Sequence, residues 1–249
     1  PLLIKKGFSK RNILILENEK ATKSAISKAF RQLSSQSQTG DYIYIHFSCH
    51  GQQMIDDNGD EPDGLDEALI PYDAKRRYYK GIYEGENHLR DDELGLSLDA
   101  IRTKIGKDGN ITVVLDACHS GTGTRNNDED VYVRGTTYIF APDDCDLSKM
   151  ASGKMALGLR RENYLSPLTV FSACREDEIN YEYRTADNDY YGALSYALYN
   201  VLNRNSLMAV DLFSKELENA VSNMFKLKRW QQTPFCETTD PTKIFEIGR

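Results

Sequence analysis

The stretch Asn110-Ile-Thr-Val-Val-Leu-Asp-Ala-Cys-His-Ser-Gly121 decides the fold, because it joins a buried strand to a group of reactive side chains. After Asn110 it runs through five β-branched or aliphatic residues, which is typical of a strand that is covered on both faces. An aspartate, a cysteine and a histidine follow at once. Sites in open parallel sheets form beyond the carboxyl ends of the strands, so we expect Cys118 at such an edge.

Apolar patterns on either side of this strand alternate between strands and helices. We expect further strands over residues 12–16, 41–47, 168–171 and 244–247, and helices over residues 20–33, 94–105, 192–202 and 210–227. This alternation predicts an α/β fold with a mainly parallel central sheet and helices on both faces. Two long segments, 51–92 and 122–164, interrupt it, and loops of this length are usually functional or disordered.

The composition excludes several classes of protein. The 249 residues include 31 Lys plus Arg and 38 Asp plus Glu, for a formal net charge of −7, and 40% are hydrophobic. This balance is ordinary for a soluble globular protein and argues against a nucleic-acid partner, which needs clustered basic residues. The apolar runs are far shorter than the ~20 residues of a membrane span, and no signal segment opens the sequence.

Five cysteines are present, an odd number without a Cys-x-x-Cys pair. A disulfide framework and a zinc ribbon are therefore not expected, and a reducing, cytoplasmic location is.

A second strand also ends in residues suited to chemistry, because residues 41–47 lead into Ser48-Cys49-His50-Gly51. A histidine at one strand end and a cysteine at another is the geometry that a thiol nucleophile and its base require. The N–H groups of Gly51 and Cys118 could stabilise the oxyanion. Cys49 and His119 are also present, so residue type alone leaves the pairing open.

These motifs resemble those of the metacaspases, cysteine peptidases of clan CD and family C14. The family's Ser-Gly-His-Gly and Asp-x-Cys-His-Ser-Gly motifs are matched by residues 48–51 and 116–121. An acidic segment over residues 59–73 and blocks at residues 171–175, 192–196 and 232–234 also resemble the family. The resemblance implies a caspase-like three-layer sandwich and a cysteine endopeptidase with His50 and Cys118 as its dyad. It also implies one catalytic domain over residues 1–249, with a large-subunit-like part (1–121) and a small-subunit-like part (165–249).

Asp116 bears on substrate preference. It lies two residues before Cys118, so both side chains leave an extended strand end on the same side. A carboxylate in a pocket wall needs a cation, which an Arg or Lys of a protein substrate would supply. The resemblance implies that Asp116 and Ser48 line this pocket, and Cys49 and Asp177 are further candidates. The alternative is that Asp116 only orders the turn around Cys118.

Acidic residues crowd the 51–92 segment, and hard oxygen ligands of this kind suit Ca²⁺. The resemblance implies calcium ligands at Asp66, Asp91 and Asp92. The family has a further ligand shortly after the nucleophile, but residues 122–127 contain no carboxylate. No cofactor is expected to be obligatory, calcium is the one candidate, and a solvated acidic loop is the alternative.

The segment 122–164 is a candidate for self-cleavage. It is long and polar, its basic residues match the inferred pocket, and exposed loops are where nicking concentrates. Its basic residues singled out here are Arg125, Arg134, Lys149, Lys154, Arg160 and Arg161. The alternative is a surface insertion whose basic residues are coincidental.

One family feature is not found in the sequence, the strand and helix that carry the pattern Ala-Leu-x-x-Gly-Ile-Asn. The sequence also begins at Pro1 rather than Met. We therefore expect a fragment, or a second chain that supplies the strand, since the sheet would otherwise have an exposed edge.

Three other functions stay open. A caspase-fold peptidase of the CHAT type would have a different specificity. A catalytically silent scaffold is favoured only by Cys49, which replaces the family's glycine. A flavodoxin-type domain would need a Gly-rich phosphate loop after the first strand, which is not found.

Overall fold

The computed structural model describes residues 2–59, 61, 63–118, 132–147, 159–175, 178–204, 208–228, 230–241 and 244–245. Its central sheet has four strands in the order β1-β5-β6-β10. These strands are β1 (Tyr42–Ser48), β5 (Asn110–Asp116), β6 (Leu168–Ser172) and β10 (Phe235–Thr238). The first three are parallel, and β10 is antiparallel to β6. The predicted mainly parallel sheet is confirmed.

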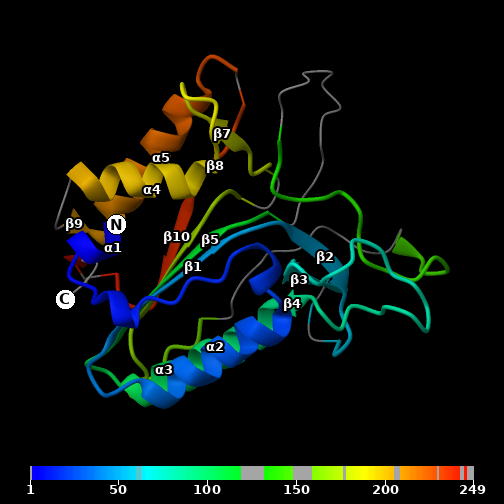
Figure 1. The fold of residues 1–249 in the computed structure, drawn as a ribbon, viewed down its shortest axis with the longest axis horizontal. Helices are drawn as coiled ribbons and strands as arrows, with labels where there is room; N and C mark the ends of the chain where they lie inside the picture. The colour runs from blue at the N-terminus through cyan, green and yellow to red at the C-terminus, as the bar shows by residue number, and fades with distance from the viewer. Residues whose placement is uncertain are drawn as a thin grey trace.

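Helices cover both faces of this sheet (Figure 1). Helices α2 (Lys23–Gln36) and α3 (Asp91–Ile105) lie on one face, and α4 (Ala193–Arg204) and α5 (Val210–Phe225) lie on the other. The two faces follow from the alternation of side chains along β5, where Val113 belongs to the α2–α3 core and Val114 to the α4–α5 core. Among the described residues, no helix has both the length and the apolar character needed to cross a bilayer.

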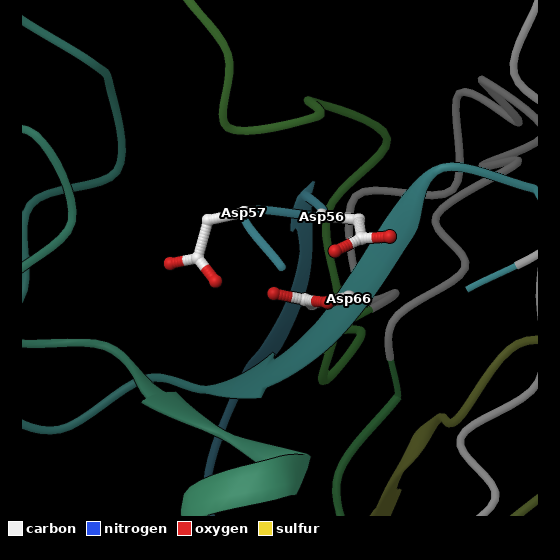
Figure 2. Close-up of side chains that lie close together, drawn as sticks. All are labelled: Asp56, Asp57 and Asp66. Carbon is white, nitrogen blue, oxygen red and sulfur yellow. The ribbon is translucent and has the colours of Figure 1, made fainter. Parts of the chain in front are cut away.

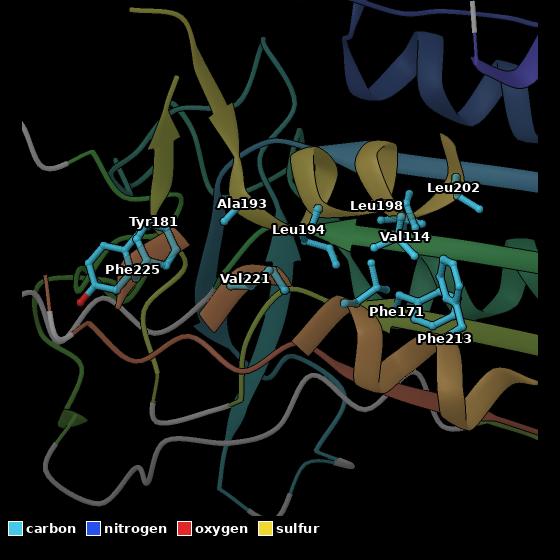
Figure 3. Close-up of a cluster of buried hydrophobic side chains, with 14 of the residues drawn as sticks. Val114, Phe171, Tyr181, Ala193, Leu194, Leu198, Leu202, Phe213, Val221 and Phe225 are labelled. Atoms are coloured by element: carbon cyan, nitrogen blue, oxygen red, sulfur yellow. The ribbon is translucent and has the colours of Figure 1, made fainter. Parts of the chain in front are cut away.

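The core beneath α4 and α5 is rich in large apolar side chains (Figure 3). The rings of Phe171 on β6 and Phe213 on α5 meet edge to face, with centroids 5.4 Å apart. Leu194 and Leu198 of α4 are fully buried in the same cluster. Each such side chain contributes about 1.5–3 kcal/mol on burial. This packing fixes where α4 begins, which matters for the site described below.

Further short strands lie outside the central sheet. A three-stranded antiparallel sheet is formed by β2 (Gly51–Ile55), β3 (Leu65–Leu69) and β4 (Leu89–Arg90). Strands β7 (Glu182–Arg184) and β8 (Tyr190–Gly192) form a hairpin, and β9 (Met208–Ala209) pairs with β11 (Ile244–Phe245). The chain also begins with α1 (Leu2–Lys5) and two 3₁₀ turns, η1 (Lys10–Asn12) and η2 (Asn18–Lys20). The segment 51–92, expected as a loop, therefore contains a small sheet.

One strand prediction was wrong, and one strand of the central sheet was not predicted. Residues 13–17 form no strand, and Leu14 and Ile15 are 63% and 65% exposed, so this apolar run is not part of the core. The fourth strand of the central sheet is β10, whereas β11, predicted over residues 244–247, pairs with β9. Strand β10 escaped prediction because it is short and all of its residues are only half-buried.

Candidate active site

The ends of β1 and β5 bring the two predicted motifs to the same edge of the sheet. Ser48 pairs with Asp116 at the end of the two strands, and the N–H of Cys49 donates to the Asp116 carbonyl at 3.2 Å. Just beyond, the N–H groups of Gly51 and Cys118 donate to one and the same oxygen, the carbonyl of Arg134, each at 3.1 Å. The two predicted oxyanion donors therefore converge on a single peptide carbonyl.

The Cys118 side chain lies below this point. The residue is 3% exposed, and its thiol donates to the Glu178 carbonyl at 3.4 Å. The thiol of Cys174 approaches the same oxygen at 3.7 Å. A hydrogen bond with the Cys118 sulfur, together with burial, raises the pKa of Cys174 well above its ordinary value. Two buried sulfurs thus lie side by side at the end of β5 and β6.

His50 stands at the surface above the end of β1. The protein around the imidazole ring partly shields it from water, and this lowers the pKa of His50. The positive charges of Arg134 and Arg76 lower the pKa further, and the negative charge of Glu182 raises it to a smaller extent. A lowered pKa keeps the imidazole neutral near neutral pH, which is the form that can accept a proton. Arg134, Glu182 and His50 therefore lie within electrostatic reach of one another.

Cys49 and His119 are the alternatives to Cys118 and His50 as nucleophile and base. Burial raises the pKa of Cys49 to about 12, and its side chain packs against the α2–α3 core. A thiol of this kind is a poor nucleophile, because the thiolate is the reactive form. His119 and the predicted pocket residue Asp177 lie outside the described residues.

The segment around Arg134 runs through the site as an added strand. Val133 forms an antiparallel bridge with Tyr181, and hydrogen bonds flank it on both sides. The Arg134 N–H donates to the Asn180 carbonyl at 2.9 Å, and the Glu182 N–H donates to the Tyr132 carbonyl at 2.8 Å. This is how an extended peptide pairs with an exposed strand.

The Arg134 side chain occupies a polar pocket. Its Nη1 donates to the Ser48 hydroxyl at 2.7 Å, and its Nη2 lies 3.4 Å from a Glu182 carboxylate oxygen. The side chain is 13% exposed. Ser48 was predicted for a basic pocket. Glu182 was not, because only the fold places it opposite the end of β1.

Asp116, the last residue of β5, is completely buried. One carboxylate oxygen accepts from the Asn180 side chain at 2.9 Å, and the other accepts from the Ser195 N–H at 2.8 Å and its hydroxyl at 2.6 Å. A Cβ at Gly192 would collide with this carboxylate. Asp116 thus stabilises the first turn of α4, whereas the alternative role predicted for it was to order the turn around Cys118.

The block at residues 232–234, noted in the sequence only as a resemblance, holds in place the residues that pair with Tyr132–Arg134. Gln232 donates to the Ala173 carbonyl and to the Asn180 side chain, and it accepts from the Tyr181 N–H. The Glu178 carboxylate accepts from the N–H and the hydroxyl of Thr233, at 2.6 and 2.7 Å. The Gln232-Thr-Pro block therefore anchors residues 178–181, a role that sequence spacing cannot reveal.

The predicted calcium ligands fall into two groups, because neighbouring residues of β3 face opposite ways. Asp66 forms an ion pair with Arg90, and its carboxylate clusters with those of Asp56 and Asp57 within 4.8 Å (Figure 2). Asp57 also pairs with Arg90, at 3.1 Å. The guanidinium of Arg90 thus already supplies a cation to this group.

Glu67 faces the other way, toward Asp91. Burial raises the pKa of Glu67 to about 8, and the nearby carboxylates of Asp91, Asp63 and Glu61 contribute. Burial likewise raises the pKa of Asp91 to about 7. Glu67 is 1% exposed, and among the described residues its Oε2 has no hydrogen-bond partner. Asp92, also predicted as a ligand, is exposed and accepts from Asn58 at 2.7 Å.

Comparisons with known proteins agree with these features. Residues 3–125, about half of the chain, match the family model described as metacaspase, peptidase C14 domain. The chain is 26% identical over 225 residues to Metacaspase-2 of Arabidopsis thaliana, covering 88% of this chain and 49% of that protein. It is 38% identical over 122 residues to Metacaspase-3 of the same plant, covering 47% of this chain and 30% of that protein. The chain thus spans about half or less of the length of these relatives.

A crystal structure of protein GSU0716 from Geobacter sulfurreducens shares the fold. The TM-score is 0.59, and the match covers 95% of this chain and 79% of that one at 20% identity. Metacaspase-1 of Eremothecium gossypii is 31% identical over 127 residues, covering 49% of this chain and 25% of that protein. With the family model spanning both His50 and Cys118, the chain belongs to the metacaspase family of C14 peptidases.

Proposed function

We propose that the protein is a cysteine endopeptidase that hydrolyses peptide bonds after Arg or Lys in protein substrates. One observation supports this most strongly. A peptide carbonyl, that of Arg134, accepts hydrogen bonds from both Gly51 and Cys118, while the side chain of the same residue is held by Ser48 and Glu182. These are the contacts that a cleavable peptide with a basic side chain would make.

In the proposed reaction, His50 accepts the thiol proton of Cys118. The thiolate sulfur attacks the carbonyl carbon of the substrate, and the N–H groups of Gly51 and Cys118 stabilise the resulting oxyanion. The carbon–nitrogen bond breaks, and the imidazolium of His50 protonates the departing amine. Water then hydrolyses the thioester, which releases a carboxylate and restores the thiol.

The preference for a basic side chain is supported by charge. Glu182 and Ser48 contact the guanidinium, and the Asp116 carboxylate lies in the same region, since both it and Arg134 act on the pKa of His46. An acidic side chain in this pocket would face Glu182 and leave it unpaired, which costs several kcal/mol. We propose that Lys is accepted less well, because it lacks the two-armed geometry of Arg.

We propose that calcium stimulates this activity by binding at Glu67 and Asp91. The Glu67 oxygen without a hydrogen-bond partner and the raised pKa values of both residues mark a buried acidic site, for which no ion pair with a basic side chain is found among the described residues. Glu67 and Asp91, with Asp63 and Glu61 beside them, would supply hard oxygen ligands, which Ca²⁺ prefers. Asp66, whose carboxylate is paired with Arg90, suits this role less well than the sequence suggested.

We also propose self-processing within residues 122–164 and a reducing, cytoplasmic setting. Support for the setting comes from the cysteines, all five of which are free. A partner strand is a further proposal. Strand β1 is at the edge of the central sheet in the described part of the chain, and a strand from another segment or a second chain would fit beside it.

Hydrolysis of matched fluorogenic peptides tests the proposal. Acetyl-Val-Arg and acetyl-Val-Lys amides should be cleaved, and the corresponding Asp amide should not, with and without Ca²⁺. Cleavage of the Asp peptide alone would favour a caspase-fold peptidase of another specificity. No cleavage of any peptide by the reduced protein, even after incubation with Ca²⁺ to allow self-processing, would favour the scaffold and contradict the proposal.

A further inference from the structure

One stretch of the chain, Tyr132–Phe140, is held on both sides of the Cys118 thiol. Upstream, Tyr132–Arg134 pairs with Asn180–Glu182. Downstream, the Tyr138 carbonyl accepts from the Gln52 side chain at 2.8 Å, and Phe140 pairs with β2 through its N–H to the Gln53 carbonyl at 2.8 Å. The chain therefore crosses the site from the β7 side to the β2 side.

Between these two anchors lies the Arg134–Gly135 peptide bond. Its carbonyl oxygen is the atom to which both Gly51 and Cys118 donate. The residue before the bond is the one whose guanidinium is held by Ser48 and Glu182. Its Nε is buried without a hydrogen-bond partner among the described residues, and its Nη1 and Nη2 make the polar contacts with Ser48 and Glu182.

Other basic residues of the same segment are held elsewhere where the structure describes them. Arg160 lies 3.4 Å from Asp99 of α3, and Arg161 donates to the Thr238 carbonyl on β10. Arg125, Lys149 and Lys154 lie outside the described residues. Arg134 is therefore distinguished by position rather than by residue type.

We propose that Tyr132–Arg134 is an internal substrate and that Arg134–Gly135 is the bond cut in self-processing. This inference rests on the proposed peptidase function and specifies it. Until the bond is cut, the segment covers Cys118 and keeps other peptides out. Two further residues then help to select substrates: Glu182 recognises the basic side chain, and Tyr190 accepts an aromatic side chain two residues earlier.

The second assignment comes from the ring of Tyr132. It meets the ring of Tyr190 edge to face, with centroids 4.9 Å apart and an interplanar angle of 78°. Aromatic pairs of this geometry attract each other in addition to the effect of burying the rings. An external substrate in the same register would gain from Tyr, Phe or Trp at that position.

The cleavage follows the chemistry already given. The Cys118 sulfur bonds to the Arg134 carbonyl carbon, the bond to the Gly135 nitrogen breaks, and that nitrogen takes a proton from His50. Water hydrolyses the thioester, so one water is consumed for each cut. The products are residues 1–134 with a new carboxylate and residues 135–249 with a new amine.

Intact mass spectrometry of the full chain tests this inference. We expect wild type, with reductant and Ca²⁺, to give fragments whose junction is Arg134–Gly135. Arg134→Gln should be cut at least tenfold more slowly. Arg134→Lys should still be cut, which shows that loss in Arg134→Gln is not misfolding, and Arg161→Gln should match wild type. Cys118→Ala should stay intact.

A peptide assay run in parallel separates the inference from the function on which it rests. We expect uncut Arg134→Gln to hydrolyse acetyl-Tyr-Val-Arg-aminomethylcoumarin at least as fast as uncut wild type, since its site is less occupied. A junction elsewhere, or Arg134→Gln cut at the wild-type rate, would overturn the inference and leave the function intact. Hydrolysis of the peptide by wild-type protein that is still uncut would also overturn the inference and leave the proposed function intact. A wild type with neither activity would overturn both.

Occupation of the site by Tyr132–Arg134 can be measured without catalysis. In the Cys118→Ala background, the added Arg134→Gln change should strengthen binding of a fluorescent Tyr-Val-Arg-Gly peptide about tenfold or more. Equal affinities in the two proteins would contradict an internal occupant.

Discussion

The edge of the central sheet and strand β3 both bury carboxylates, but among the described residues only those at the sheet edge, Asp116 and Glu178, have a hydrogen-bond partner for each oxygen. Asp116 receives three hydrogen bonds, and the Glu178 carboxylate is held by Thr233. On β3, by contrast, Glu67 keeps an unpartnered oxygen among the described residues and a pKa raised to about 8. Burial without a partner costs free energy, so the second region is stable only with a proton or a cation.

The difference separates two tasks. The sheet edge is preorganised for a peptide, because its donors already point at the Arg134 carbonyl. On β3, a proton or the proposed Ca²⁺ would neutralise the buried carboxylates of Glu67 and Asp91. Substitutions on β3 should therefore change the proposed calcium response without changing the residues at the sheet edge.

Removing the nucleophile should have the largest effect. Cys118→Ala should lower kcat/KM for an Arg peptide by about 10,000-fold or more, and His50→Ala by about 100-fold to 10,000-fold. Stopped or continuous fluorescence assays would measure both. Cys145→Ala is the control and should change little. If Cys49→Ala were as damaging as Cys118→Ala, the assignment of the nucleophile would be wrong.

Changing the pocket should have a smaller and selective effect. Glu182→Gln should lower kcat/KM for an Arg peptide by about 10-fold to 100-fold, because the substrate guanidinium loses its carboxylate partner and a contact with a charged group contributes about 1.5–3 kcal/mol. Ser48→Ala should cost about 2-fold to 10-fold, since a neutral partner contributes less. Neither substitution should lower kcat/KM for a matched peptide in which Gln replaces the Arg. Glu218→Gln on the exposed side of α5 is the control, and an equal loss on both peptides would show a structural effect instead.

Calcium should stabilise the protein through β3. Ca²⁺ at about 100 times its dissociation constant should add about 2.7 kcal/mol, or roughly 5–10 °C in Tm for a chain of this size. Glu67→Gln should remove most of this gain in differential scanning fluorimetry. Asp57→Asn, at an exposed residue already paired with Arg90, should retain it. The reverse pattern would place the ion in the Asp56–Asp57–Asp66 group.

Stability should also depend on pH in a characteristic direction. The pKa values of Glu67 and Asp91 are raised to about 8 and about 7 in the folded protein, far above their values of about 4 when unfolded. Between these limits the folded state binds more protons than the unfolded state, so the free energy of unfolding falls as pH rises.

Urea unfolding in a calcium chelator should show this fall as a loss of about 1–3 kcal/mol between pH 6 and pH 8. Glu67→Gln should reduce the loss. A free energy of unfolding that rises over this range would contradict the assignment of buried, unpaired carboxylates on β3.

The sequence predicted the layers well and the small sheet poorly. Strand β5 and helix α3 were predictable because apolar spacing directly reports burial on one face or two. Strands β2 and β3 were not, because they bury polar residues such as Gln52 and Glu67, which pattern rules assign to loops. The run at residues 12–16 was mistaken for a strand since hydropathy cannot show whether a pairing partner exists.

The site was predictable to the extent that motifs follow strands. His50 and Cys118 could be placed at one edge because both come directly after parallel strands. The basic residue that reaches the pocket, Arg134, could not be predicted, because its position depends on the path of a segment without helix or strand periodicity. The choice between Asp66 and Glu67 depends on strand register, which puts Asp66 opposite Met54 and Glu67 opposite Gln53.

Covalent capture tests the central claim most directly. A peptide acyloxymethyl ketone ending in Val-Arg should label the reduced protein once, and tandem mass spectrometry should place the adduct on Cys118, with no adduct from the matching Asp reagent. Labelling of Cys49 or Cys174 instead, or equal labelling by both reagents, would contradict a basic-specific site built on Cys118 and His50.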